Sequence, residues 1–155
     1  MAAIDAAVRL AYALGYRLLR LWWYFRRPDH QGAVVAVWHH GRILMLRHSY
    51  RRRLGWPGGG VGRGEDPRQA ARRELREELA LEVADDALAY LGETPQRWEH
   101  RRDRVHIFEL TLETPPSLRP DRREVVAAEF MAPEDALGRE IAPFIRAYLE
   151  RRPKK

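Results

Sequence analysis

The spacing of hydrophobic residues first predicts a long amphipathic helix over residues 3–27. Apolar side chains recur there at helical intervals and share one face, and arginines share the opposite face. The apolar face consists of Leu10, Leu14, Leu18, Leu21 and Phe25, and the basic face of Arg9, Arg17, Arg20 and Arg27. Because arginines interrupt the apolar run, this segment is not predicted to span a membrane. We interpret residues 1–28 as an N-terminal helical appendage.

The rest of the chain alternates between strand-like and helix-like patterns. Residues 33–38 and 42–47 are rich in apolar and β-branched residues, and the intervening His39-His40-Gly41 predicts a hairpin turn. A helical pattern covers Pro67–Leu79, and Asp66 is placed to cap its start. Three further strands and a final helix are expected at residues 88–91, 105–112, 125–130 and 142–151.

The length of 155 residues suits one well-cored domain. Strands with helices between and after them favour an α+β layered fold. We assign this domain to residues 29–152, followed by a basic tail at residues 153–155. The chain contains no cysteine, which excludes disulfides, thiolate nucleophiles and sulfur-based zinc sites and is consistent with a cytoplasmic location.

The formal net charge of +6 comes from the two ends of the chain, because basic and acidic residues are balanced between them. A duplex-binding protein usually needs a concentrated basic surface on its folded body, so nucleic acid is disfavoured as a partner. Two roles remain open for the N-terminal helix. Its apolar face packs on the domain or on a second copy in a homodimer, or the helix makes peripheral contact with an anionic membrane.

The clearest candidate chemistry lies on the second predicted helix. Glu74, Glu77 and Glu78 have the spacing i, i+3 and i+4, so their carboxylates share one arc of this helix. Like charges on one arc repel unless a cation neutralises them, and Mg²⁺ is usually held by a few carboxylates plus substrate phosphates. The arc is therefore a candidate site for Mg²⁺ or Mn²⁺. The alternative is a solvated acidic face that pairs with nearby arginines.

These glutamates lie within a longer pattern that resembles the Nudix box. The pattern runs from Gly59 through five residues to Glu65, through seven more to Arg73-Glu74-Leu75-x-Glu77-Glu78, and ends at Leu81. At one position the chain departs from it, because Ala80 stands where the family has glycine. That glycine lets the chain leave the helix in a left-handed conformation, which costs other residues roughly 1 kcal/mol. Ala80 therefore predicts a longer helix or a shifted exit.

The resemblance implies an α+β fold of the α/β/α sandwich type, with a mixed sheet between helices, and metal-dependent hydrolysis of a diphosphate bond. It implies that the metal ligands are Glu74, Glu77, Glu78 and the backbone carbonyl of Gly59. Arg73 and Glu65 resemble a supporting pair that orients Glu74. The residue that accepts the proton of the attacking water varies within the family. The candidates in this chain are Glu74, Glu93, Glu99 and Glu109.

Two groups of residues outside the box are candidates for binding substrate. Arg47, Arg51 and Arg53 lie upstream of the glycine-rich stretch, and arginine can bind phosphate through two hydrogen bonds at once. The alternative is a basic surface loop. Trp98 stands among arginines and is a candidate for stacking on a nucleobase, or it is an ordinary residue at a strand edge.

The leading functional hypothesis is hydrolysis of a nucleoside diphosphate linked to another moiety, as in ADP-ribose or a nucleotide sugar. A second hypothesis is a pyrophosphohydrolase of (d)NTPs, including oxidised nucleotides. A third is a non-catalytic, nucleotide-binding module with the same fold. Degenerate members of such families usually lose ligand carboxylates, whereas this chain retains Glu74, Glu77 and Glu78.

Overall fold

The computed structural model describes residues 11, 14–16, 18, 29–98 and 101–152. The described residues of the N-terminal segment are helical. The rest of the helix predicted over residues 3–27 lies outside the described residues, as does the predicted tail at residues 153–155. No helix in the described part of the chain is long and apolar enough to cross a membrane.

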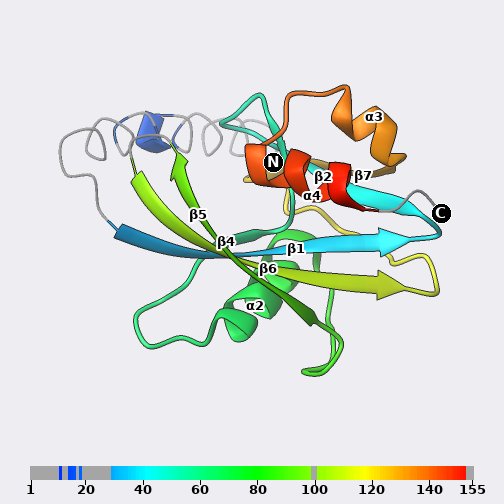
Figure 1. Cartoon of the computed structure of the whole chain (residues 1–155), viewed down its shortest axis with the longest axis horizontal. Coiled ribbons are helices and arrows are strands. Elements are labelled where there is room, and N and C mark those ends of the chain that lie inside the picture. The colour runs from blue at the N-terminus through cyan, green and yellow to red at the C-terminus, as the bar shows by residue number, and fades with distance from the viewer. Residues whose placement is uncertain (1–10, 12–13, 17, 19–28, 99–100, 153–155) are drawn as a thin grey trace.

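Seven strands form one mixed sheet (Figure 1). In chain order they are β1 (Asp29–His39), β2 (Arg42–His48), β3 (Leu54–Gly55), β4 (Gly58–Gly60), β5 (Ala89–Trp98), β6 (Arg101–Leu112) and β7 (Val125–Met131). β1 pairs parallel to β6 and antiparallel to β2 and β4. β2 also pairs with β3 and β7, and β5 pairs with β6, all antiparallel. The parallel pairing of β1 with β6 makes the sheet mixed, as the resemblance implied.

The predicted hairpin is confirmed by β1 and β2. His39 pairs with Arg42, so the turn consists of His40 and Gly41. Both turn residues have a positive φ, 46° and 73°. Two consecutive residues with positive φ form the kind of turn that matches the twist of a hairpin.

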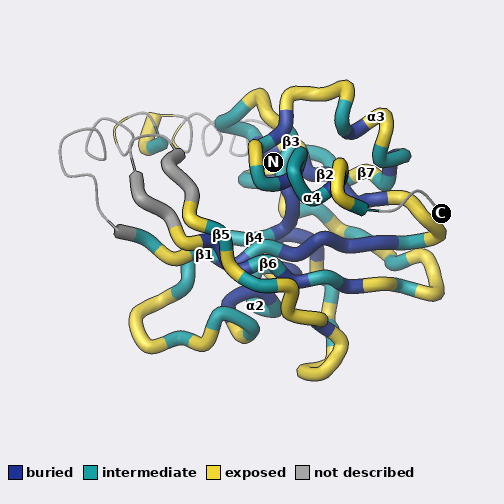
Figure 2. The backbone as a smooth tube through the Cα atoms, viewed as in Figure 1, coloured by how far each residue is buried: buried dark blue, intermediate teal, exposed yellow. Residues whose placement is uncertain are grey.

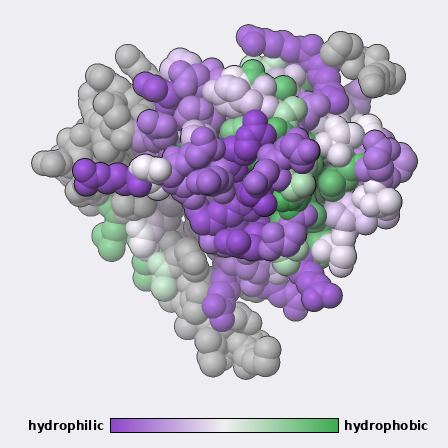
Figure 3. Space-filling model, turned by 90° about the horizontal axis from the view of Figure 1, so that it is seen from below, coloured by the Kyte–Doolittle hydropathy of each residue, from purple (hydrophilic) through white to green (hydrophobic). Residues whose placement is uncertain are grey.

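Helices cover both faces of the sheet, so the domain is an α+β sandwich (Figure 1). α2 (Pro67–Leu79) packs on one face through its buried residues Ala70, Ala71, Leu75 and Leu79. α3 (Pro133–Leu137) and α4 (Pro143–Arg151) cover the other face, where Ile145 and Leu149 share a cluster with Trp38 and Trp56. The middle of the sheet is the most buried part of the chain (Figure 2). The side of the molecule that carries α2 is mostly hydrophilic at its surface (Figure 3).

Helix α2 begins and ends at the predicted residues. The Asp66 side chain accepts hydrogen bonds from the backbone N–H groups of Arg68 at 2.8 Å and Gln69 at 3.4 Å. Ala80 follows the helix with φ 54° and ψ 33°, and its N–H donates to the carbonyl of Arg76. The expectation of a longer helix or a shifted exit is therefore wrong. Ala80 adopts the left-handed conformation that glycine usually supplies, and it bears the associated strain.

Candidate active site

A strand of three glycines brings the main chain against the glutamate-bearing side of α2. β4 pairs with β1, with Gly58 opposite Val34. A Cβ added to Gly58 would lie 2.7 Å from the Cα of Val34, and one added to Gly59 would lie 2.7 Å from the Cδ of Glu74. Real Cβ atoms essentially never come within 3.0 Å of another atom in this way. Glycine is therefore required for β4 to approach both β1 and α2.

The three glutamates of the predicted arc differ in exposure. The side chain of Glu77 is 54% exposed, that of Glu74 is 14% exposed and that of Glu78 is 5% exposed. The pKa of Glu74 is raised to about 7, mainly because burial disfavours its charged form and also because Glu78 and Glu77 are negative. A hydrogen bond from Arg73 Nη1 to Glu74 Oε1, at 2.6 Å, acts in the opposite direction.

Arg73 connects the beginning of the box with the helix. Its Nε and Nη2 donate to the two carboxylate oxygens of Glu65 at 3.0 and 3.2 Å, and Nη2 also donates to the carbonyl of Gly60 at 2.9 Å. The hydrogen bonds from Arg73 lower the pKa of Glu65. Glu65 is thus a charged anchor that fixes the guanidinium beside Glu74. The structure brings the predicted supporting pair and Glu74 together.

Glu78 lies deepest in this group. The backbone N–H of Gly58 donates to its Oε2 at 2.9 Å, and its Oε1 lies 3.3 Å from Nε2 of His48. Burial raises the pKa of Glu78 to about 8. Burial, together with the positive charge of Arg51, lowers the pKa of His48 to about 3. At pH 7 these shifts favour a neutral carboxyl group next to a neutral imidazole.

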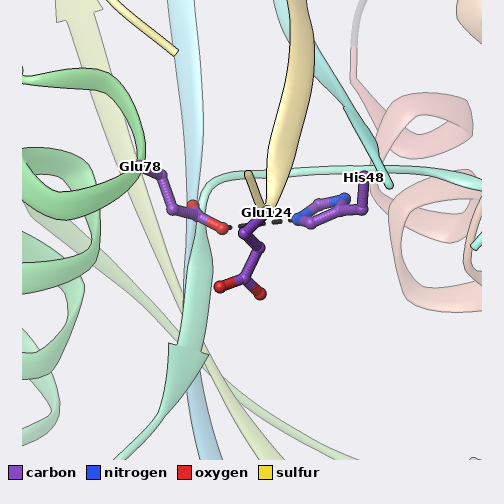
Figure 4. Close-up of side chains that lie close together, drawn as sticks. All are labelled: His48, Glu78 and Glu124. Atoms are coloured by element: carbon purple, nitrogen blue, oxygen red, sulfur yellow. Dashed lines mark hydrogen bonds and ion pairs between the residues drawn. The ribbon is translucent and has the colours of Figure 1, made fainter. Parts of the chain in front are cut away.

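One further carboxylate lies close to Glu78 and comes from a different part of the chain. His48, at the end of β2, and Glu124, just before β7, form a group with Glu78 whose ligand atoms lie within 4.8 Å of one another. Figure 4 shows the side chains of His48 and Glu78 pointing toward each other, with Glu124 beside the space between them. The hydroxyl of Tyr50 donates a hydrogen bond to Glu124 Oε1 at 2.7 Å.

The segment that carries Glu124 is attached to the end of α2. The backbone N–H of Arg119 donates to the carbonyl of Leu79 at 2.9 Å, and that of Asp121 donates to the carbonyl of Glu78 at 3.3 Å. The Asp121 side chain in turn accepts a hydrogen bond from the N–H of Glu124 at 3.0 Å. The helix that carries the predicted metal ligands therefore also determines where Glu124 lies.

The sequence did not single out His48, Tyr50 or Glu124. His48 follows Leu44 and Leu46 at alternate positions of β2, and all three are buried. The sequence therefore did contain a signal for His48, because a polar residue stands there at a position of the strand that faces inward. No comparable local signal marks Tyr50 or Glu124, because the pairing of β2 with β7 brings their segments together.

Of the proton acceptors predicted after the box, the structure places Glu109 on the other face of the sheet. Glu109 is on β6 and accepts hydrogen bonds from Tyr148 and from Arg152, the latter at 2.6 Å. These partners belong to α4 and the residue after it, so Glu109 lies on the face of the sheet opposite to α2. Glu93 lies on β5, 3.9 Å from Arg104 and from His106, and Glu99 is outside the described residues.

Arg51 is the predicted substrate-binding arginine that the structure places in this centre. Its Nη2 lies 3.2 Å from Nε2 of His48, and its guanidinium lies 5.5 Å from the centre of the Tyr50 ring. It is half-buried, so a positive charge lies beside a group of carboxylates. Such a charge is suited to an anionic substrate that also carries a bound cation.

Arg47 and Arg53 are not brought into the same group. Arg53 forms an ion pair with Glu140, with Nε and Oε1 2.5 Å apart. Arg47 is exposed on β2. Trp98 ends β5, and its side chain lies outside the part of the chain that the structure describes.

The chemistry of the centre fits a hard divalent cation. Glu74 and Glu78 both have a raised pKa, chiefly because they are buried. A divalent cation among the carboxylates offsets this penalty, because it favours their charged form. The ligand atoms are mainly oxygens, which Mg²⁺ and Mn²⁺ prefer. The carbonyl of Gly59, predicted as a further ligand, lies next to Gly32 of β1, where an added Cβ would be 3.3 Å from it.

Comparison with solved structures shows a shared fold. The chain resembles the MutT protein from Methanosarcina mazei Go1 with a TM-score of 0.70 and 18% identity, over 81% of this chain and 94% of that one. For an Ap4A hydrolase from C. elegans the TM-score is 0.67 with 21% identity, over 78% and 93% of the two chains. For a bifunctional NMN adenylyltransferase/ADP ribose pyrophosphatase from Francisella tularensis it is 0.62 with 20% identity, over 84% and 41%.

The sequence itself decides the family. A comparison with curated protein sequences gives no significant match. The family model described as NUDIX domain matches residues 28–151, which is most of the chain and includes all the glutamates of the centre. The chain therefore belongs to the Nudix family and is a hydrolase that acts on pyrophosphate bonds.

Proposed function

We propose that the chain hydrolyses a nucleoside diphosphate linked to a second moiety, such as ADP-ribose or a nucleotide sugar, with Mg²⁺ or Mn²⁺ as cofactor. The observation that carries the proposal is the set of three glutamates on one side of α2. Arg73 donates to Glu74 at 2.6 Å and to Glu77 at 3.3 Å. The N–H of Gly58 donates to Glu78, so each of the three carboxylates has a partner that helps to orient it. A prearranged set of oxygen donors suits a cation that also contacts a diphosphate.

Five residues are proposed to hold the metal ions. They are Glu74, Glu77, Glu78, Glu124 and, through its backbone carbonyl, Gly59. When bound, the ions polarise the phosphoryl oxygens and lower the pKa of coordinated water. The contribution of the surrounding residues is orientation, because Arg73 fixes Glu74 and is itself fixed by Glu65. Partners of this kind usually matter nearly as much as the ligands themselves.

The proposed reaction adds water across one P–O bond of the diphosphate. The water oxygen bonds to phosphorus, the bond to the leaving phosphate breaks, and a base accepts the proton of the water. We assign Glu74 and Glu124 as the candidates for this base. Glu74 is half-buried beside the glycine strand, where Arg73 holds its carboxylate. Glu124 is half-buried beside the proposed ligands.

The substrate class rests on the family and on Arg51. Nudix substrates are nucleoside diphosphate derivatives, and Arg51 supplies a positive charge beside the carboxylates for the phosphates. One structural relative has ADP ribose pyrophosphatase in its name, which makes ADP-ribose the first compound to test. The rival substrates are (d)NTPs, including oxidised nucleotides, and these give a nucleoside monophosphate and pyrophosphate instead.

A substrate panel tests the proposal. The full chain is incubated with Mg²⁺ and ADP-ribose, nucleotide sugars, dinucleoside polyphosphates or (d)NTPs, and the products are separated by ion-exchange chromatography. The variant Glu77→Gln removes one proposed ligand with little change of shape. The exposed Glu82→Gln, just beyond α2, is the matched control. We expect Glu77→Gln to lower turnover at least 100-fold, Glu82→Gln to retain it within about twofold, and EDTA to abolish it.

The outcomes separate the parts of the proposal. Release of a nucleoside monophosphate and a sugar phosphate supports the substrate class. Preferential turnover of a (d)NTP would contradict the proposed substrate class but would still support the proposed metal centre. No turnover of any compound, together with no binding of Mn²⁺ by the folded protein, contradicts both.

A further inference from the structure

The N-terminal segment meets the candidate active site through a pair of tyrosines. The ring of Tyr16 lies 4.7 Å from the ring of Tyr50, measured between centroids, with 44° between the ring planes. Tyr16 is half-buried, whereas its neighbours Leu14 and Leu18 are 50% and 69% exposed. Among the described residues of this segment, Tyr16 is therefore the side chain turned toward the domain. The NUDIX model begins at residue 28, so Tyr16 lies outside the family domain.

Tyr50 connects this contact to the carboxylates. Its hydroxyl donates to Glu124 at 2.7 Å, and Glu124 belongs to the group formed with His48 and Glu78. The Tyr50 ring also lies 5.5 Å from the ring of His48. Only a short chain of contacts therefore separates Tyr16 from the proposed metal ligands.

The backbone beside Tyr50 is joined to the Glu124 segment, because the N–H of Ser49 donates to the carbonyl of Glu124 at 2.8 Å. Residues 49–53 form neither a helix nor a strand. The direction of the hydroxyl depends on where the ring lies, so the ring must be held by its packing. A tilted pair of aromatic rings at this distance is a favourable arrangement. Tyr16 thus contributes to the packing that sets the position of the Tyr50 ring.

We propose that Tyr50 is a positioning residue that orients the Glu124 carboxylate, and that Tyr16 of the N-terminal segment positions Tyr50. This inference rests on the proposed function, in which Glu124 acts as a ligand or base. It means that a segment preceding the Nudix domain takes part in assembling the active centre. The N-terminal segment is then needed for turnover, independently of any surface that it presents to a membrane or a second copy.

Substitutions in the full chain test the proposal with two readouts. The first is kcat and KM for the best substrate of the panel. The second is Mn²⁺ binding followed by electron paramagnetic resonance, which needs no substrate. The variants are Tyr16→Ala, Tyr16→Phe, Tyr50→Phe and the double variant Tyr16→Ala/Tyr50→Phe. Leu18→Ala, an exposed position of the same segment, is the control for a general effect of altering that segment.

We expect Tyr50→Phe to lower kcat or Mn²⁺ affinity about tenfold, because loss of such a supporting contact typically costs tenfold or more. Tyr16→Ala should lower the same quantity three- to tenfold with little change in KM. Tyr16→Phe should restore it to within about twofold of the unaltered chain, because the ring is retained. Tyr16→Ala should add little in the Tyr50→Phe background, since the hydroxyl through which it acts is already absent.

Three results would overturn the inference. In the first, Tyr16→Ala matches Leu18→Ala. In the second, Tyr16→Phe fails to restore what Tyr16→Ala loses. In the third, the effects of Tyr16→Ala and Tyr50→Phe multiply. Glu124→Gln separates this inference from the proposed function: if it lowers kcat or Mn²⁺ affinity while Tyr16→Ala changes neither, only the inference fails. If Glu124→Gln changes neither, the proposed role of Glu124 fails as well.

Discussion

The carboxyl group of Glu74 occupies the space that a side chain at Gly59 would need. The closest approach would be to the carboxylate itself rather than to a flexible neighbour, because Glu74 is held by Arg73. β4 and α2 therefore pack closely at this point, and a methyl group on Gly59 would force them or the Glu74 side chain to move apart.

Replacing Gly59 with alanine should therefore displace Glu74. We expect kcat/KM and Mn²⁺ affinity to fall at least tenfold, because Glu74 can no longer lie beside β4. Steady-state kinetics and a Mn²⁺ titration measure the two quantities. Gly138→Ala is the control, since its φ of −74° suits alanine and the nearest atom to a Cβ there is 3.4 Å away. Equal activity of the two variants would count against the proposed role of Glu74.

Two of the three arginines in the loop after β2, Arg51 and Arg53, should respond differently to substitution. Arg51 lies beside His48, whereas Arg53 is paired with Glu140. We expect Arg51→Ala to raise KM or lower kcat/KM about tenfold or more, because a charge-assisted contact to phosphate is lost. Arg53→Ala should stay within about twofold. If Arg53→Ala instead lowered kcat/KM more than Arg51→Ala did, the substrate phosphates would lie near Arg53 and Glu140.

The metal-free protein should lose stability as the pH rises from 6.5 to 8. The folded-state pKa of Glu78, about 8, lies well above its ordinary value of 4.5, so in this range the unfolded chain has released a proton that the folded chain retains. The free energy of unfolding then falls with pH, by about 2 kcal/mol over this interval. His48 acts with the opposite sign, but only between its folded pKa of about 3 and its ordinary value of 6.5. Thermal unfolding at several pH values measures the slope.

Added Mg²⁺ should reverse this loss, because it favours the charged carboxylates. Glu78→Gln should reduce the pH dependence between 6.5 and 8, since glutamine does not titrate, and leave the smaller contribution of Glu74, whose pKa is raised to about 7. The exposed Glu82→Gln should leave the pH dependence unchanged. A melting temperature that stays constant or rises between pH 6.5 and 8 in the absence of metal would contradict the raised pKa of Glu78.

Ala80 offers a stabilising substitution. It has φ 54° and ψ 33°, a conformation that costs alanine about 1 kcal/mol or more and glycine little. Part of the gain is offset because glycine makes the unfolded chain more flexible. We expect Ala80→Gly to raise the free energy of unfolding by about 0.5 kcal/mol, measured by urea denaturation. Ala84→Gly, at an exposed position without a positive φ, should instead lower it.

The features of α2 could be predicted because they are local. Asp66 caps the helix through N–H groups two and three residues away, and the shared arc of the glutamates follows from helical spacing alone. The hairpin of β1 and β2 is equally local, since its turn lies between the strands that it joins. In each case the residues that determine the structure are visible within one short stretch.

The rest of the centre depends on contacts between distant segments. His48 is 30 residues from Glu78, and Tyr50 is 74 residues from Glu124. The sequence showed the strands β2 and β7 but not that they are neighbours, because alternation indicates a strand and does not name its partner. The same limitation explains why Glu109 was a wrong candidate for the base. Its strand was predicted, but the sequence did not show that its side chain lies on the face of the sheet opposite to α2.

The attachment of residues 119–124 to the end of α2 has a consequence for how this enzyme can vary. Because Arg119 and Asp121 bond to the last carbonyls of that helix, the place of Glu124 does not depend on how many residues lead there from β6. The mostly exposed stretch at residues 113–117 can therefore be lengthened, shortened or used to carry a label while Glu124 keeps its position.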